Sequence, residues 1–185
     1  MRRVKARPEP RTKTSGLHLR GITEADHDDV VAGIGDLAVS WMLARVPHPY
    51  TQRDADAFFA YARGVIARGT MLYVGIADRD RIVGALSIEG IPGRPVLGYW
   101  LARSHWGNGI MPRATAAVIG HAFDTLGIRV VRSGAFTDNP RSLRVQEKLG
   151  FRRIGRRRMR SLARGTEVEH IDTVLTPALF RERLR

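Results

Sequence analysis

The apolar residues of this chain recur with two different spacings. Between residues 51 and 69 they return every three or four positions, which predicts an amphipathic helix capped by Thr51 and closed by Gly69. The buried face of that helix is expected to hold Ala55, Phe58, Phe59, Ala62, Val65 and Ile66. The same criteria predict further helices over four other stretches, at about 24–36, 38–44, 111–126 and 139–150.

Short apolar runs bounded by Gly, Pro and charged turns lie between these helices. They predict strands over residues 17–22, 71–77, 82–89, 96–102, 129–136, 151–161 and 170–176. The strands from 71 to 102 are joined by short turns and should form an antiparallel meander. The strand at 96–102, the following helix and the strand at 129–136 form a β-α-β unit, whose strands lie parallel. The pattern therefore predicts an α/β fold built on a mixed sheet.

The chain shows no internal repeat and no linker that would separate two domains. We therefore expect one domain over residues 17–176, with the strands at 151–161 and 170–176 paired through the segment "ARGTEVE". Residues 1–16 are rich in charge and proline and predict a flexible basic arm. Residues 177–185 are expected to form a C-terminal tail with one helical turn.

Composition excludes several classes of function. The 185-residue chain has no cysteine, so disulfides, thiolate metal sites and a cysteine nucleophile are excluded. The six histidines show no ligand spacing, and we predict no metal site. No apolar run reaches the roughly 18 residues that would span a bilayer, so we expect no membrane partner. A cytoplasmic location fits this composition.

The charge balance predicts an anionic partner. Lys and Arg number 31 against 18 Asp and Glu, a formal net charge of +13. Arginines gather in residues 1–13 and 152–160. They could meet nucleic acid, a phosphate-bearing cofactor or an acidic protein surface. The alternative interpretation is an arginine-rich composition spread over solvated faces.

The segment "SHWGNGIMPRA", residues 104–114, places glycines where a helix begins. Gly107 and Gly109 can adopt positive φ and let the backbone approach a ligand closely. The unpaired amides at the start of the helix and the positive end of its dipole favour an anion there, and Pro112 fits the first turn. This arrangement predicts a pyrophosphate site; a plain turn is the alternative interpretation.

A second segment, "TDNPRSLRVQEKLGF", begins at the carboxyl end of a predicted strand. Asn139 and Ser142 would lie at the edge of the parallel strands, where ligands of open α/β sheets bind. Asn139 followed by Pro140 is equally typical of a helix cap, which is the alternative role.

Together "GYWLARSHWGNGIMPRATAAVIGHAF" and "DNPRSLRVQEKLGF" resemble the GCN5-related N-acetyltransferases (GNAT), most closely the ribosomal-protein N-terminal acetyltransferase branch. The resemblance covers residues 17–176 and implies a GNAT-type central mixed sheet of about seven strands, splayed at its middle, with helices on both faces. It implies transfer of an acetyl group from acetyl-CoA, a co-substrate, to a primary amine by direct attack in a ternary complex. The acceptor would be a protein N-terminus or a small amine. A homodimer and a contact with the ribosome are further expectations.

The resemblance also implies roles for individual residues. The pyrophosphate loop falls on Trp106, Gly107, Asn108, Gly109, Ile110 and Met111, with Met111 where the family has Gly or Ala. The pantetheine arm would pair with the backbone of Leu101, Ala102 and Arg103, and Asn139 would hydrogen-bond it. Ser142 would lie beside the sulfur and protonate the departing thiolate. A strand N–H near Leu101 could polarise the thioester carbonyl.

The general base is less well defined. Val96 stands where the branch often has Glu, and Glu89 on the preceding strand is the nearest carboxylate in sequence. We predict Glu89 as the base, with Glu167, Glu169 and His105 as other candidates and a surface acid as its alternative role. Because Tyr99 and Trp100 point to opposite faces of a strand, one should line the cleft and the other should pack in the core.

Two other functions stay open on the sequence alone. A non-catalytic acyl-CoA-binding sensor would keep the glycine loop and lack a base, which Val96 makes worth testing. A basic nucleic-acid-binding protein would use the arginine-rich segments, although these lack interleaved aromatic residues and known reading motifs.

Overall fold

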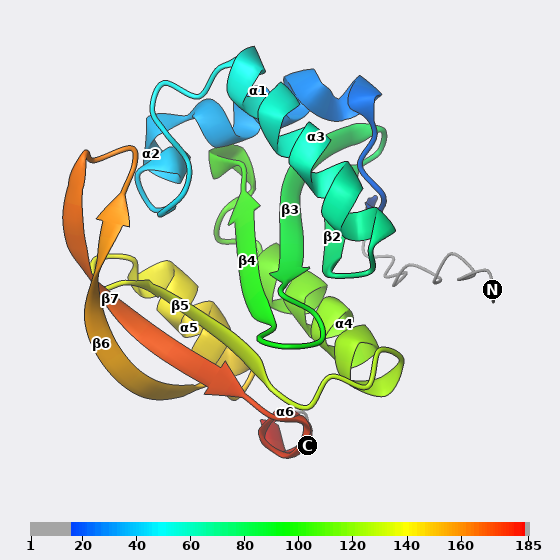
Figure 1. The fold of residues 1–185 in the computed structure, drawn as a ribbon, viewed down its shortest axis with the longest axis vertical. Coiled ribbons are helices and arrows are strands. Elements are labelled where there is room, and N and C mark those ends of the chain that lie inside the picture. Colours follow the sequence, from blue (N-terminus) through cyan, green and yellow to red (C-terminus); the bar gives the residue numbers. More distant parts are fainter. Residues whose placement is uncertain (1–15, 184–185) are drawn as a thin grey trace.

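The computed structural model describes residues 16–183, so the predicted basic arm lies, apart from Gly16, outside the described residues. Seven strands form a single mixed sheet in the order β1-β2-β3-β4-β5-β7-β6 (Figure 1). Their bounds are β1 Leu17–Arg20, β2 Met71–Asp78, β3 Arg81–Glu89, β4 Val96–Leu101, β5 Val131–Phe136, β6 Arg152–Ser161 and β7 Thr166–Leu175. The helices are α1 His27–Gly35, α2 Leu37–Ser40, α3 Gln52–Ala67, α4 Ile110–Asp124, α5 Pro140–Lys148 and α6 Pro177–Arg183, with short 3-10 turns at Glu24–Asp26 and Arg103–His105.

Apolar side chains pack on both faces of the sheet, as predicted. On one face, Val30 and Ile34 of α1 and Phe59 of α3 pack against strand residues such as Ala85. On the other face, the apolar side of α4 packs into a larger cluster with β2, β3 and β4. Figure 1 shows α3 in front of β2 and β3, and α4 behind the strands. None of the helices among residues 16–183 is both long and apolar enough to cross a membrane.

Helix α3 shows how local sequence sets an element. Thr51 caps it, and the Asp54 carboxylate accepts hydrogen bonds from the Thr51 N–H and hydroxyl at 2.8 and 2.6 Å. The predicted buried face holds at Ala55, Phe59, Ala62 and Val65, whereas Phe58 is half-buried and Ile66 is 43% exposed.

The sheet divides between β4 and β5. These parallel strands are paired at a single position, Val96 with Arg132. The Arg132 N–H donates to Pro95 O at 2.8 Å, and the Ser133 hydroxyl donates to Leu97 O at 3.1 Å. Beyond these contacts the two strands diverge (Figure 1). The splayed sheet implied by the sequence is therefore confirmed.

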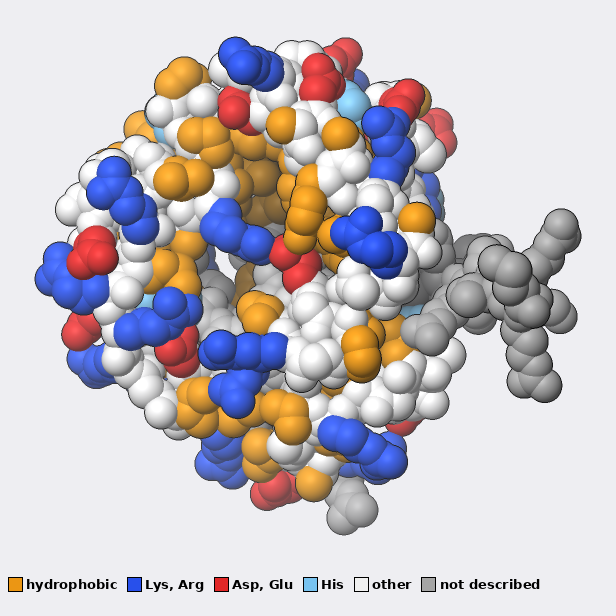
Figure 2. All heavy atoms as spheres, in the orientation of Figure 1, with side chains coloured by type: hydrophobic (Ala, Val, Ile, Leu, Met, Phe, Trp, Pro, Cys, Tyr) orange, Lys and Arg blue, Asp and Glu red, His pale blue; other side chains and the backbone are white. Residues whose placement is uncertain are grey.

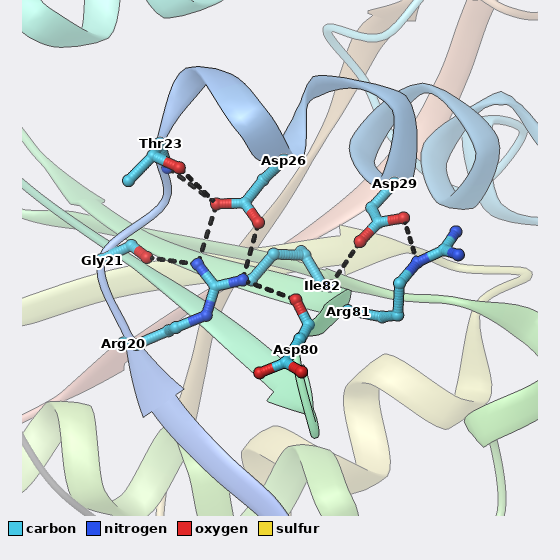
Figure 3. Close-up of polar contacts among 8 residues, drawn as sticks. All are labelled: Arg20, Gly21, Thr23, Asp26, Asp29, Asp80, Arg81 and Ile82. Carbon is cyan, nitrogen blue, oxygen red and sulfur yellow. Dashed lines mark hydrogen bonds and ion pairs between the residues drawn. The ribbon is translucent and has the colours of Figure 1, made fainter.

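An ion-pair network fastens β1 and α1 to the hairpin between β2 and β3 (Figure 3). The Arg20 guanidinium donates to both carboxylate oxygens of Asp26 at 2.8 and 2.6 Å, and the Thr23 N–H donates to Asp26 at 2.8 Å. Arg20 also donates to Asp80 O, and Asp29 accepts the Ile82 N–H at 2.9 Å. The Arg20 contact holds the pKa of the buried Asp26 carboxyl at about 2, below its ordinary 3.8.

Some predicted bounds were wrong. The helix expected over 38–44 ends at Ser40, because the carbonyls beyond it bond outside the helix: Trp41 O accepts from Arg164 and Ala44 O from the Leu162 N–H. The last strand begins at Thr166 instead of residue 170, since charged side chains on both faces of this hairpin hide the strand pattern. The strand expected from residue 129 begins at Val131. The tail forms α6, longer than the expected single turn, and buries Phe180 against Phe123.

Candidate active site

The glycine loop precedes α4 as predicted. Gly107 and Gly109 have φ of 82° and 67°, and a Cβ would meet open space at Gly107 and only the tip of Arg113 at Gly109. Backbone conformation, and not crowding, therefore requires glycine there. The side chains of Ile110 and Met111 are buried in the core, so the bulk of Met111 lies away from the exposed loop. The first amides of α4 have no partner within the helix and can bind an anion.

Basic and aromatic side chains surround this loop. Arg103 and Arg113 are exposed beside it, and Arg113 donates to Asn108 O at 3.3 Å. The Arg141 guanidinium of α5 lies over the Trp106 ring, 4.8 Å from its centroid. The Trp106 indole N–H donates to Leu101 O at 2.7 Å. Trp106 thus links the end of β4 to α5 across the division of the sheet.

The inner edge of β4 presents backbone groups to the gap. The Ala102 N–H donates to Val83 O of β3 at 2.8 Å. Because alternate residues of a strand direct their N–H and C=O groups to opposite sides, Tyr99 and Leu101 direct theirs toward β5. Of the backbone at 101–103 that was predicted to pair with pantetheine, the Leu101 N–H faces the gap. The Ala102 N–H is already bonded to Val83 O.

A buried hydrogen-bond network crosses the gap. The hydroxyl oxygens of Ser142 and Tyr99 lie 2.8 Å apart. The Gln146 amide donates to both, at 3.3 and 3.4 Å, and to Gly134 O at 3.1 Å. Gln146 in turn accepts from the Thr173 hydroxyl at 2.7 Å. Burial raises the pKa of the Tyr99 hydroxyl, which keeps it protonated. This network fixes the position of Ser142, the residue predicted to protonate the thiolate.

Both predicted roles of Asn139 are compatible with its position. Its side-chain oxygen accepts the Ser142 N–H at 3.1 Å, which caps α5. That bond uses the oxygen and not the side-chain NH2 group, so the NH2 can still serve a ligand. Asn139 and Ser142 both line the cleft described below.

The cleft occupies about 2090 Å³ and runs from the glycine loop past the gap to α2 and α3. Figure 2 shows it as a hollow near the middle of this face, with hydrophobic side chains on its walls and charged side chains at its rim. Four of its lining residues are exposed large apolar side chains: Leu37, Trp41, Tyr61 and Leu162. Tyr99 lines the cleft and Trp100 packs in the core cluster, as expected of the pair, although Trp100 also reaches the cleft wall.

The predicted base Glu89 lies on the wall of this cleft and is held in an ion pair. Both of its carboxylate oxygens accept from the Arg45 guanidinium, at 3.0 and 2.6 Å, and its side chain is 16% exposed. The Ser87 hydroxyl also approaches it, at 3.4 Å. Both carboxylate oxygens are therefore already engaged by a guanidinium at the cleft wall.

The other candidate bases are placed differently. Glu167 and Glu169 pair with Arg158 and Arg156 across the exposed β6–β7 hairpin. The His105 Nε2 lies 3.6 Å from Asp78, and its Nδ1 lies 2.9 Å from the Ser104 hydroxyl. Among residues 16–183 no three His, Cys, Asp or Glu side chains are grouped as metal ligands would be.

Sequence reasoning missed a histidine on the cleft wall. His170 of β7 is 8% exposed, and its ring lies edge-on to Phe136 with centroids 5.8 Å apart. Its Nδ1 lies 3.0 Å from Asp172, whose carboxylate also accepts from Arg157 at 2.9 Å. Burial is the main cause that lowers the pKa of His170 below its ordinary 6.5. The spacing His-Ile-Asp in a strand, which places both polar residues on one face, was the available signal.

Comparison with known proteins assigns the chain to a family. A family model described as an acetyltransferase (GNAT) domain matches residues 16–152. The chain therefore belongs to the GNAT acetyltransferase family, as its two motifs predicted.

Individual relatives agree with this assignment. The chain is similar to the probable N-acetyltransferase YjcK of Bacillus subtilis, 33% identical over 55% of this chain and 59% of that protein. It is also similar to the ribosomal-protein-serine acetyltransferase of Escherichia coli, 33% identical over 45% of this chain and 49% of that protein. The chain thus spans between about half and three fifths of these curated relatives. Among solved structures, Mycobacterium smegmatis RimJ in complex with CoA-disulfide has the same fold, with a TM-score of 0.78 and 20% identity over 91% of this chain and 87% of that chain.

Proposed function

We propose that this protein transfers the acetyl group of acetyl-CoA to a primary amine. The observation that carries the proposal is the placement of the Gly107–Gly109 loop at one end of a gap in the sheet whose middle holds the Ser142–Tyr99 pair. The loop and the start of α4 bind the pyrophosphate, and the exposed Arg103 and Arg113 add positive charge. The pantetheine then enters the gap as a strand would, against the β4 edge and the Asn139 side-chain amide.

Catalysis follows from this placement. The Leu101 N–H is directed into the gap and would polarise the thioester carbonyl. The amine attacks the carbonyl carbon in a ternary complex, and positioning of the two reactants supplies several kcal/mol of the rate enhancement. As the C–S bond breaks, Ser142 protonates the thiolate and Tyr99 donates to Ser142 in turn. Glu89 and His170 both lie on the cleft wall as candidates for the proton of the amine.

The acceptor enters from the end of the cleft near α2 and α3. Its exposed apolar side chains, Leu37, Trp41 and Tyr61, suit an acceptor that carries an apolar group near the amine. The Escherichia coli relative is named a ribosomal-protein-serine acetyltransferase, which points to a protein as the acceptor. We therefore propose a protein or peptide N-terminus as the acceptor class, with a small amine as the alternative.

The test is an acceptor screen with acetyl-CoA, read by release of free thiol, alongside CoA titration by calorimetry. Binding of CoA with thiol release that depends on an amine supports the proposal. Binding of CoA without turnover for any acceptor would support a non-catalytic sensor instead. A nucleic-acid role is less favoured, because four arginines of the basic segment are paired with carboxylates: Arg153, Arg156, Arg157 and Arg158.

A further inference from the structure

The proposed reaction needs a group that removes a proton from the incoming ammonium. Val96 pairs at the closed end of the gap, is 42% exposed and has no group that could take this proton. The proton acceptor must therefore come from elsewhere on the cleft wall.

We infer that His170 Nε2 accepts the proton of the acceptor amine and that Asp172, held by Arg157, orients the His170 ring. This inference rests on the proposed acetyl transfer and identifies a residue of the same site. Three features of the structure support it: the position of the ring, the state of its two nitrogens, and the charged groups around it.

The ring lies on the wall of the cleft and its position is tightly set. His170 pairs with Phe136 across β5 and β7, and its ring packs edge-on against the Phe136 ring. Its Cε1 and Nε2 lie over Gly134 of β5, where a Cβ would be 2.2 Å from Cε1 and 3.0 Å from Nε2. Only glycine at position 134 leaves room for the ring. Gly134, Phe136 and His170 all line the cleft.

Asp172 determines which nitrogen carries the proton. Both of its oxygens accept from the Arg157 Nε, at 3.1 and 2.9 Å, so Asp172 acts as an acceptor beside the ring. The Nδ1, 3.0 Å from Asp172, must then be the nitrogen that donates. The neutral ring therefore has an unprotonated Nε2, which is the form a general base requires.

The surroundings favour a neutral ring at pH 7. Asp172 of β7 attracts a proton to the ring, whereas Arg157 of β6 opposes it, and burial opposes it most strongly. On the β5 side the His170 ring meets the Phe136 ring. The Arg164 guanidinium lies over the same Phe136 ring, 4.8 Å from its centroid, and is paired with Asp138. Burial is thus the largest effect, and it keeps the base ready to take a proton.

Glu89 also lies on the cleft wall, but it differs from His170 in the partners of its acceptor atoms. Both of its oxygens are already engaged by the Arg45 guanidinium in a bidentate ion pair. We therefore assign the proton to His170, and Glu89 with Arg45 to the shape and charge of the acceptor entrance.

The proton balance is complete with the groups present. The ammonium gives one proton to His170 Nε2, which passes it to solvent, and the neutral amine attacks the carbonyl carbon. Formation of the C–N bond and cleavage of the C–S bond release a thiolate, which takes the Ser142 proton. When the amide forms, the former amine nitrogen loses its second proton, and this proton restores the Ser142 hydroxyl.

The experiment uses the full chain with acetyl-CoA and either a serine-initiated peptide or benzylamine, read by thiol release. We expect His170→Gln to lower kcat about a hundredfold, with CoA affinity unchanged by calorimetry, which also shows that the variant is folded. The acid limb of the kcat profile, expected below pH 6.5 in the unmodified chain, should disappear. His170→Ala should be partly rescued by added imidazole. Asp172→Asn should lower kcat about tenfold, and Glu89→Gln should keep the acid limb.

His18→Gln, on β1 at the far edge of the sheet, is the matched control and should leave kcat unchanged. Nitrogen NMR of the unmodified chain should show His170 protonated at Nδ1 and not at Nε2 at pH 7. The opposite tautomer, or an acid limb that survives in His170→Gln, overturns the inference while the proposed function stands. An unmodified chain that binds no CoA, or that releases no thiol with either acceptor, overturns both.

Discussion

The hydroxyl oxygens of Tyr99 and Ser142 lie 2.8 Å apart, although β4 carries one residue and α5 the other, on opposite sides of the division in the sheet. The distance brings a second hydroxyl to the serine that would protonate the leaving thiolate. Gln146, buried to 1% exposure between them and Thr173, fixes both groups. The two halves of the sheet are thus joined by polar side chains at the point where the backbone ladder has ended.

Loss of the serine hydroxyl should slow turnover more than it weakens cofactor binding. We expect Ser142→Ala to lower kcat by about ten- to a hundredfold, because the thiolate would leave without a proton. Tyr99→Phe should act in the same direction with a smaller effect. Steady-state kinetics and CoA calorimetry measure both. Ser161→Ala, which truncates a buried serine at the end of β6, is the control. Equal kcat in Ser142→Ala and the unmodified chain would remove the acid role.

A charged side chain at the glycine loop should abolish CoA binding. Gly109→Glu places a carboxylate where the pyrophosphate is proposed to bind, and we expect no heat of binding by calorimetry. Gly127→Glu is the matched control, because Gly127 follows the other end of α4 with the same φ of 67° and no atom within 4 Å of a Cβ. Both substitutions place a side chain at the same positive φ and therefore introduce similar backbone strain. Retained affinity in Gly109→Glu, or equal loss in both, would argue against the pyrophosphate site.

The ion pair of Asp26 should make stability fall in acid. Its folded pKa of about 2 lies below the ordinary 3.8, so its contribution is complete above pH 3.8 and is lost as the pH falls toward 2. The difference corresponds to about 2 kcal/mol of unfolding free energy. Urea denaturation at pH 7 should show Asp26→Asn less stable by about that amount. The gap between the two proteins should shrink between pH 4 and pH 2; a constant gap would contradict the prediction.

Local patterns were enough to predict the elements and the loop. The glycines, the helix start and the cap at Asn139 each depend on residues close together in sequence, and all lie where they were expected. The parallel order of β4 and β5 followed from the handedness of the β-α-β unit.

Contacts set by sheet register could not be predicted in the same way. The approach of Tyr99 to Ser142 depends on how far β4 and β5 diverge, and the Arg45–Glu89 pair on where the loop after α2 returns. His170 and Asp172 lie two residues apart, yet their importance emerges only when β5 places Gly134 beneath the ring. Charge on both faces of the β6–β7 hairpin also concealed the start of β7.

The single Val96–Arg132 pairing joins β4 to β5 at one end only, and within the described residues the remaining backbone groups on the facing strand edges have no strand partner across the gap. A coenzyme arm lying along the β4 edge would supply the missing rungs of the ladder. Hydrogen–deuterium exchange should then report the loading of the protein directly: the Leu101 amide should exchange quickly in the free chain and slowly once CoA is added, while the amides of β2 should change little.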